Sequence, residues 1–250
     1  MRTLLMRFAA PIQSWGIGAL FERRGTERHP TKSGIVGFCA SSMGILRHED
    51  AKIAQLAQLR VGTRTDAPGT LIEDFHMVHA EDFWDINNRS KPNPKSKLSI
   101  ITRRYYLSDA TFLVGIEGSE EILKAIENAV KFPWFPQYLG RRNCPPEGQV
   151  ILGIIDLPLL DALKEYPPLI DNVSSARIVI DADNEGINHH KKSYLICDYP
   201  ISFNSSYRNI TYRRVEEYVV VFNQNNASDE TENNHEHDIF GAIEENQLCI

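Results

Sequence analysis

The residues best suited to chemistry are two adjacent arginines in the segment "WFPQYLGRRNCPP", residues 134–146. Gly140 precedes Arg141 and Arg142, and a glycine lets the backbone approach a ligand closely. Prolines and aromatic residues surround the pair, so we expect guanidinium groups beside flat rings on a stiff loop. Forked arginine donors match phosphate oxygens, and aromatic rings stack on unpaired bases. The segment predicts an RNA contact, with a loop whose arginines pair with nearby carboxylates as the alternative.

Charge is unevenly distributed along the 250 residues, whose net charge is −6. Residues 223–250 hold seven Asp or Glu and no Lys or Arg, so the overall −6 leaves +1 for residues 1–222. Residues 86–108 hold six cations and no acid, namely Arg89, Lys91, Lys95, Lys97, Arg103 and Arg104. Local sign steers a polyanion more than net charge does. We therefore count Arg89, Lys95, Lys97, Arg103 and Arg104 among the candidate RNA contacts.

A second polar stretch, "ERRGTERHPTKS" at residues 22–33, precedes an apolar run at helical spacing. Its cations Arg23, Arg24 and Lys32 are further candidate RNA contacts. A hydroxyl of Thr31 or Ser33 can cap the helix that begins there.

Catalytic and metal-binding patterns are weak in this chain. His76 and His79 lie three apart in a predicted strand and so face opposite ways, which argues against a shared metal. The four cysteines are far apart, and neither a disulfide framework nor a zinc site is expected. No cofactor is predicted. A metal-independent ribonuclease could recruit an acid, a base and a cation from His29, Lys32, His76, Tyr105 and Tyr106, but their spacing does not require it.

The elements that must position these residues follow an α+β pattern. The order strand, helix, strand, strand, helix, strand is the ferredoxin-like plan, which we place in residues 1–155. The expected strands are 3–9, 61–65, 70–79, 105–117 and 150–155, and the expected helices are 31–46, 50–59 and 120–130. The polar insertion at about 80–104 is expected to be a long hairpin or a loop.

The C-terminal part is predicted to be different in character. Residues 156–222 should form a small β-rich subdomain with a helix at 159–166 and strands near 176–182, 193–200 and 210–222. Residues 223–250 are expected to be an acidic, flexible tail that is solvated, folds on a partner or shields basic surfaces. No run of about 18 apolar residues exists, so we expect no membrane segment and a cytoplasmic location.

Five segments in order, "MRFAAPIQSWG", "PTKSGIVGFCASSMGI", "DFHMV", "YLSDATFLV" and "YLGRRNCP", resemble the CasD-type subunits of type I-E Cascade, the RNA-guided ribonucleoprotein of CRISPR antiviral defence. The resemblance covers about residues 1–155. It implies a RAMP-type ferredoxin-like fold, related to RNA-recognition domains, with a protruding β-hairpin thumb at about 80–104. Within that family, Gln13, Trp15 and His76 become candidate RNA contacts beside Gly140, Arg141 and Arg142.

The resemblance also implies a function and partners. The chain would bind the 5′ handle of the CRISPR RNA without catalysis and cap the backbone filament. Its neighbours would be the CasC-type backbone subunit and the CasA-type large subunit, with target DNA reached only through the complex. Two alternatives stay open: an endoribonuclease that processes precursor CRISPR RNA, as in type I-C relatives, and a purely structural cap.

Overall fold

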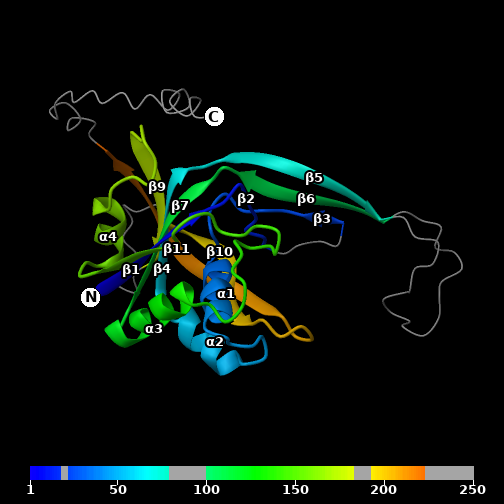
Figure 1. Ribbon diagram of the computed structural model, residues 1–250, viewed down its shortest axis with the longest axis horizontal. Helices are drawn as coiled ribbons and strands as arrows, with labels where there is room; N and C mark the ends of the chain where they lie inside the picture. The colour runs from blue at the N-terminus through cyan, green and yellow to red at the C-terminus, as the bar shows by residue number, and fades with distance from the viewer. Residues whose placement is uncertain (18–21, 79–99, 183–192, 223–250) are drawn as a thin grey trace, which may run out of the picture.

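The computed structural model describes residues 1–17, 22–78, 100–182 and 193–222, and shows two sheets, one wholly and one mainly antiparallel, with helices on both faces of the larger one (Figure 1). The larger sheet has seven strands in the order β10-β11-β9-β4-β7-β1-β8, and every neighbouring pair is antiparallel. Its strands are β1 (Arg2–Ala9), β4 (Arg60–Ala67), β7 (Thr111–Gly118), β8 (Ile151–Ile155), β9 (Ser175–Asp181), β10 (Ser193–Ser202) and β11 (Asn209–Val221).

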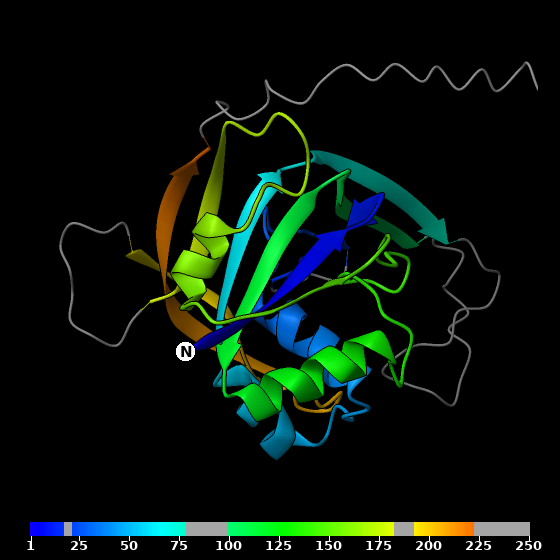
Figure 2. The ribbon, with the colours of Figure 1, turned by 60° about the vertical axis from the view of Figure 1, so that its left-hand side comes forward.

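Alternating side chains of the central strands supply two separate cores. On β1, Leu4, Met6 and Phe8 join one cluster, whereas Leu5 joins the other, because successive side chains of a strand point to opposite faces. The first cluster is covered by α1 (Lys32–Ser42), α2 (Asp50–Ala57) and α3 (Glu120–Lys131). The second is covered by α4 (Leu159–Glu165) (Figure 2).

Helix α4 lies close to the sheet because two strand positions carry no side chain. A Cβ on Gly62 of β4 would lie 2.7 Å from Leu163 Cδ1, and one on Gly115 of β7 would lie 2.7 Å from Leu159 Cδ1. These glycines thus leave room for the two leucines, which are fully buried. The N-terminus of α1 is capped as the sequence predicted, since the Thr31 hydroxyl accepts a hydrogen bond from the Gly34 N–H at 3.2 Å.

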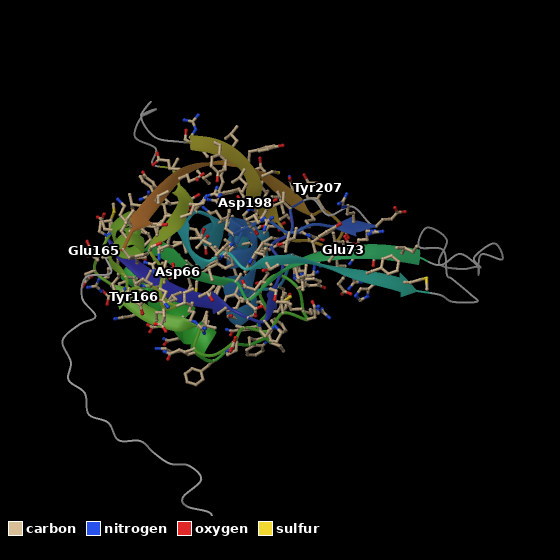
Figure 3. The ribbon with its side chains drawn as sticks, turned by 90° about the horizontal axis from the view of Figure 1, so that it is seen from above. Asp66, Glu73, Glu165, Tyr166, Asp198 and Tyr207 are labelled. Atoms are coloured by element: carbon tan, nitrogen blue, oxygen red, sulfur yellow. The ribbon has the colours of Figure 1, made fainter. Side chains whose placement is uncertain are left out.

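The smaller sheet forms an arm that extends away from the body of the molecule (Figure 1). Its long pair consists of β5 (Thr70–Val78) and β6 (Ile100–Ser108), in register from Thr70 opposite Ser108 to Val78 opposite Ile100. The short strands β2 (Ile12–Gln13) and β3 (Arg23–Arg24) also pair with β6. Glu73 lies on this arm, whereas Glu165 and Tyr166 lie at the opposite end of the molecule (Figure 3).

The single strand predicted over residues 105–117 is wrong. The chain forms two strands, β6 and β7, that belong to different sheets and are separated at Asp109. Asp109 has a φ of 55°, a left-handed conformation that aspartate tolerates better than most residues. This turn lets β6 leave the main sheet, and the C-terminal end of the predicted thumb, residues 100–104, lies in that regular strand.

The C-terminal strands extend the main sheet. Strand β9 pairs with β4, β11 pairs with β9, and β10 pairs with β11. Residues 156–222, predicted as a β-rich subdomain, therefore share one sheet with the N-terminal part, while the subdomain boundary itself stays a prediction. Within the described residues, every helix is too short or too polar to span a lipid bilayer.

Candidate nucleic-acid interface

A pocket of about 860 Å³ lies among α1, the loop that follows α3, and the turn between β10 and β11. Three arginines line it, Arg47, Arg142 and Arg208, and all three are exposed to solvent. None of the described residues that line the pocket is Asp or Glu. The pocket therefore offers fixed positive charge without a neutralising carboxylate in its wall, which suits a polyanion.

Aromatic side chains share the wall with the arginines. Phe135 and Tyr138 come from the loop after α3, Phe203 comes from the β10–β11 turn, and Trp15 follows β2. Flat rings beside cations are the usual components of a single-strand site, because bases stack on the rings while the cations follow the phosphates. Phe132 and Trp134 are 84% and 76% exposed just before the lining segment.

Gly140 fixes the loop that carries Arg142. Its φ is +90°, and a Cβ at this position would lie 1.6 Å from the carbonyl oxygen of Ser14. The Ser14 N–H also donates to the Leu139 carbonyl at 3.2 Å, and the Leu139 N–H donates to the Cys144 carbonyl at 2.7 Å. The glycine predicted to let the loop approach RNA thus lets it approach the segment after β2.

Arg141 ties the same loop to the base of the arm. Its Nη2 donates to the Arg24 carbonyl at 2.8 Å, and its guanidinium carbon lies 4.7 Å from the centre of the Tyr106 ring. Its Nη1 is buried and has no hydrogen-bond partner among the described residues. Arg142, the next residue, is exposed and lines the pocket, so the two adjacent arginines occupy different environments.

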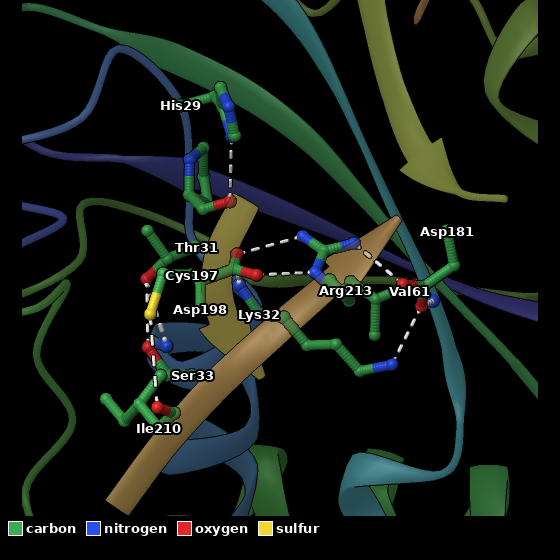
Figure 4. A network of polar contacts seen from close by, with 12 residues as sticks. His29, Thr31, Lys32, Ser33, Val61, Asp181, Cys197, Asp198, Ile210 and Arg213 are labelled. Atoms are coloured by element: carbon green, nitrogen blue, oxygen red, sulfur yellow. Dashed lines mark hydrogen bonds and ion pairs between the residues drawn. The ribbon is translucent and has the colours of Figure 1, made fainter. Parts of the chain in front are cut away.

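A buried charge network joins the start of α1 to the C-terminal strands of the main sheet (Figure 4). Lys32 Nζ lies 2.8 Å from Asp181, and the Lys32 N–H donates to Asp198 at 2.7 Å. Arg213 bridges the two carboxylates, at 2.7 Å from Asp181 and at 2.6 and 2.9 Å from Asp198. The start of α1 is thereby joined to β9, β10 and β11. Because the backbone N–H groups of Lys32 and Gly34 are already bonded, they do not offer an anion site.

The network shifts the ionisation of its members. Burial raises the pKa of Asp181, but Arg213 and Lys32 outweigh it and leave the pKa below the ordinary 3.8. Burial lowers the pKa of Lys32 from its ordinary 10.5, and Asp181 partly opposes this. Burial likewise holds the pKa of the nearby His29 below 6.5. Lys32 is 3% exposed, so its place is in the core and not on the surface where an RNA contact was predicted.

The arm carries the second group of cations. Arg23 Nη2 donates to the Tyr105 hydroxyl at 3.1 Å and lies over that ring, and Arg103 lies over Phe75 while it pairs with Glu73. The register places Phe75 opposite Arg103, with Met77 and Ile101 further along on the same face. Met77 is 60% exposed and Phe75 is 52% exposed. This face therefore combines cations with exposed apolar side chains.

The remaining predicted contacts fall into three groups. Gln13 and Trp15 are buried: Gln13 Nε2 donates to the Ala110 carbonyl at 2.7 Å, and Trp15 stacks on Phe8 with ring centres 5.7 Å apart. Arg24, Arg104 and His76 lie in the paired strands of the arm, where Arg24 is opposite Arg104 and His76 contacts Asp74. Arg89, Lys95 and Lys97 lie outside the described residues.

The candidates for a ribonuclease are not gathered at one place. His29 and Lys32 are buried beside the start of α1, whereas His76 lies on β5 of the arm. Tyr106 is 1% exposed, and its hydroxyl accepts a hydrogen bond from Asn143 at 3.0 Å. In the described ranges, no three His, Cys, Asp or Glu side chains are grouped as metal ligands would be.

Sequence reasoning missed Arg47, Phe203 and Arg208. Arg208 and Phe203 belong to the turn "SFNSSYRN", residues 202–209, which has the same mixture of aromatic and arginine residues as residues 134–142. That shared composition was the available signal. The sequence does not indicate that these two segments line the same pocket.

The family described as "CRISPR-associated protein (Cas_Cas5)" matches residues 3–216. The chain belongs to the Cas5 family. A curated relative, the CRISPR system Cascade subunit CasD of Escherichia coli (strain K12), is 30% identical over 191 residues, which are 70% of this Cas5 chain and 82% of CasD. These matches confirm the resemblance to CasD-type subunits.

Two solved structures share the fold of this Cas5 chain. One, titled "Crystal structure of Cas protein", has 34% identity and a TM-score of 0.67, with 88% of this chain and 95% of that chain covered. The other, titled "CRISPR RNA-guided surveillance complex", has 25% identity and a TM-score of 0.71, with 88% and 90% covered. The mixed α/β architecture with antiparallel sheets is thus that of Cas proteins.

Proposed function

We propose that this chain is a Cas5 subunit of a CRISPR RNA-guided surveillance complex and that it binds the 5′ handle of the CRISPR RNA without cutting it. The observation that carries the proposal is the pocket with three exposed arginines, aromatic side chains and no carboxylate among its described lining residues. The matches to CasD and to a surveillance-complex structure support the assembly. Membership in a ribonucleoprotein accounts for a basic, aromatic pocket on a chain whose net charge is −6.

In this proposal each part of the site has one task. Arg47, Arg142 and Arg208 bind handle phosphates, and Phe135 and Tyr138 stack on splayed bases. Gly140 and Arg141 hold the loop in place, and Gln13, Trp15 and Lys32 support the wall from inside. The arm, with Arg23, Arg103 and Phe75, lies against the RNA as it leaves the handle and against an adjacent CasC-type backbone subunit.

The fold supports the same assignment. The order β8-β1-β7-β4, with α1 after β1 and α3 after β7, supports the ferredoxin-like arrangement that we propose for a RAMP-type domain. The arm leaves this unit between β4 and β7, at the place of the predicted thumb. We further propose that this Cas5 chain caps the backbone filament beside the CasA-type large subunit.

The proposal is tested by replacing the two pocket arginines that flank the aromatic wall. Arg142→Ala with Arg208→Ala should weaken binding to a labelled, repeat-derived CRISPR RNA. It should also reduce the slope of log affinity against log salt by about 1.4, since each contact to single-stranded phosphate contributes about 0.7. Lys124→Ala is the matched control, because Lys124 is exposed on α3 and does not line the pocket. An unchanged slope in the double variant would reject the pocket as the handle site and favour a purely structural cap.

Absence of cleavage is tested with the same protein. The separation of His76 from His29 and Lys32 supports a binding role, as does the similarity to CasD. Incubation of the full chain with labelled precursor RNA in EDTA should leave the RNA intact. A specific cut that His29→Ala or His76→Ala abolishes would establish the ribonuclease alternative.

A further inference from the structure

The last 28 residues of the chain, 223–250, have a composition that complements the pocket. They hold seven carboxylates and no Lys or Arg, and the second half, "EHDIFGAIEENQLCI", adds apolar residues between the acids. The larger of these are Ile239, Phe240, Ile243, Leu248 and Ile250. These residues lie outside the part of the chain that the structure describes.

The pocket wall offers the matching surface. Arg47, Arg142 and Arg208 are exposed and have no carboxylate beside them in the described lining. Apolar side chains line the same pocket, including Phe38, Ile45, Leu46 and Ile53. A segment that alternates carboxylates with Ile and Phe can place charge on the arginines and apolar side chains on this floor.

We propose that residues 236–248 bind in this pocket of the same chain and compete there with RNA. The competition rests on the proposed function, whereas the binding of the segment does not. The acidic segment occupies the arginines as a phosphate backbone would, and Phe240 takes the place of a base among the aromatic side chains.

The segment can reach the pocket from the end of the last strand. Strand β11 begins next to Arg208, at the pocket, and its 13 residues span about 43 Å at about 3.3 Å per residue. Sixteen residues, 223–238, separate Phe222 from Ile239, and an extended chain of that length spans about 55 Å. The tether is therefore long enough to return along β11, and it keeps the segment at a high effective concentration near the pocket.

The expected contact is weak enough to be displaced. Ion pairs at exposed arginines contribute about 0–1 kcal/mol each and are screened by salt. An RNA that also engages the arm makes more contacts than the segment and displaces it, whereas a polyanion that binds only the pocket does not. The segment would thus restrict the pocket to RNA that fits the whole surface.

The binding step is tested without RNA by photocrosslinking in the full chain. A photoreactive benzoylphenylalanine in place of Phe240 should crosslink to peptides that line the pocket, chiefly residues 133–142 and 203–208. Crosslinking should fall in Arg142→Ala with Arg208→Ala and stay unchanged in Lys124→Ala. Crosslinks elsewhere, or crosslinks indifferent to the double variant, would overturn the proposal. A mixture of isotopically heavy and light chains shows whether the crosslinked segment and pocket belong to the same chain. If every crosslink joins a heavy chain to a light chain, the segment comes from a second copy and binding within one chain is rejected.

The competition step is tested by neutralising the segment in the full chain. All seven carboxylates of residues 223–250 are changed to the matching amides, which leaves every described element unaltered. If the segment fills the pocket for about nine-tenths of the time, affinity for a labelled single-stranded oligouridylate should rise about tenfold. The gain should vanish near 1 M salt, where screening acts over about 3 Å. An unchanged affinity at low salt rejects the competition.

The two proposals fail in distinguishable ways. If the residue at position 240 crosslinks to the pocket but RNA affinity does not depend on Arg142 and Arg208, the pocket is not the RNA-handle site. The proposal that residues 236–248 bind in the pocket is then still supported. If RNA affinity depends on those arginines but the crosslinks are absent, the segment proposal alone is rejected.

Discussion

Gly140 packs against the carbonyl oxygen of Ser14 so closely that a Cβ at Gly140 would lie 1.6 Å from that oxygen. This contact joins the loop that carries Arg142 to the segment that follows β2. The position of the pocket arginine thus depends on a glycine that need not touch RNA. The glycine is required twice, by its φ of +90° and by the lack of space for a side chain.

Gly140→Ala should therefore lower both stability and RNA binding. The left-handed backbone alone costs an L-residue about 1–2 kcal/mol, and the clash with Ser14 moves the loop as well. Chemical denaturation and RNA titration measure the two effects. Gly25→Ala is the control, because a Cβ there meets nothing within 4 Å. Equal behaviour of the two variants would contradict the role assigned to Gly140.

The adjacent arginines should separate into two classes. Arg141→Ala should lower the free energy of unfolding by about 1–3 kcal/mol, because it removes a charged hydrogen bond and a ring contact. Arg142→Ala should change that free energy by less than about 0.5 kcal/mol, as expected for an exposed side chain. Both should weaken RNA binding. Denaturation midpoints and RNA affinities are measured for both variants. An equal loss of stability in the two would show that the adjacent arginines do not differ in this way.

Asp198→Asn should be strongly destabilising. The change removes the Asp198 carboxylate from the start of α1 and from Arg213, which keeps Asp181, and breaking a buried pair costs about 3–5 kcal/mol. Asp156→Asn, which removes an exposed pair with Arg2, should cost less than about 1 kcal/mol. Thermal and urea unfolding of both variants test this, and a mild effect of Asp198→Asn would mean that the network contributes little to the fold.

Acid should destabilise the protein through His29. Burial lowers the pKa of His29 from 6.5, so below that pH the unfolded chain takes up a proton that the folded chain refuses. Folding stability therefore falls as the pH drops, by at most about 1.4 kcal/mol per pH unit for one group. Burial raises the pKa of Glu27 above 4.5, which acts in the opposite sense at lower pH.

The His29 effect is isolated by comparing the natural chain with His29→Gln. Urea unfolding at about pH 7.5 and about pH 6.0 should show the larger loss of stability in the natural chain. Glu27 is common to both proteins, so its contribution cancels in the comparison. Identical pH dependence in the two proteins would exclude His29 as the group responsible.

Shortening the arm should separate folding from assembly. A Gly-Ser turn in place of residues 79–99 should leave the free energy of unfolding within about 0.5 kcal/mol, because every described core residue lies outside that range. It should lower incorporation into the RNA-bound complex and expose the junction between handle and spacer. Co-purification with the other subunits and nuclease protection measure these effects, and normal assembly would reject the arm as an RNA-holding thumb.

The sequence predicted most regular elements because their signals are local. Hydroxyl caps, apolar periodicity and turn residues located α1, α3 and the C-terminal strands to within a few residues. The join of β6 and β7 was missed because Asp109 turns the chain without a neighbouring glycine or proline. Nothing within that run of apolar residues indicates that its halves belong to different sheets.

The site was predicted less well, because the residues that contact one another there are far apart in sequence. Lys32 looked like a free surface cation, since its partner Asp181 is 149 residues away. Trp15 could have been a base-stacking ring or a core ring, and only its 1% exposure decides. Arg208 joins Arg142 in one pocket through the order of strands in the sheet, which periodicity does not report.

The two outer strands of the main sheet affect how readily the unassembled chain aggregates. Strand β10 carries Pro200 and two register irregularities against β11, and β8 pairs with β1 across a bulge, with Gly153 at a φ of +128°. Such interruptions make an edge a poor template for another strand, which is how natural sheets resist edge-to-edge aggregation. A subunit synthesised in excess of its CRISPR RNA can thus remain unaggregated. The amount of CRISPR RNA, and not the loss of protein to aggregation, can then limit assembly.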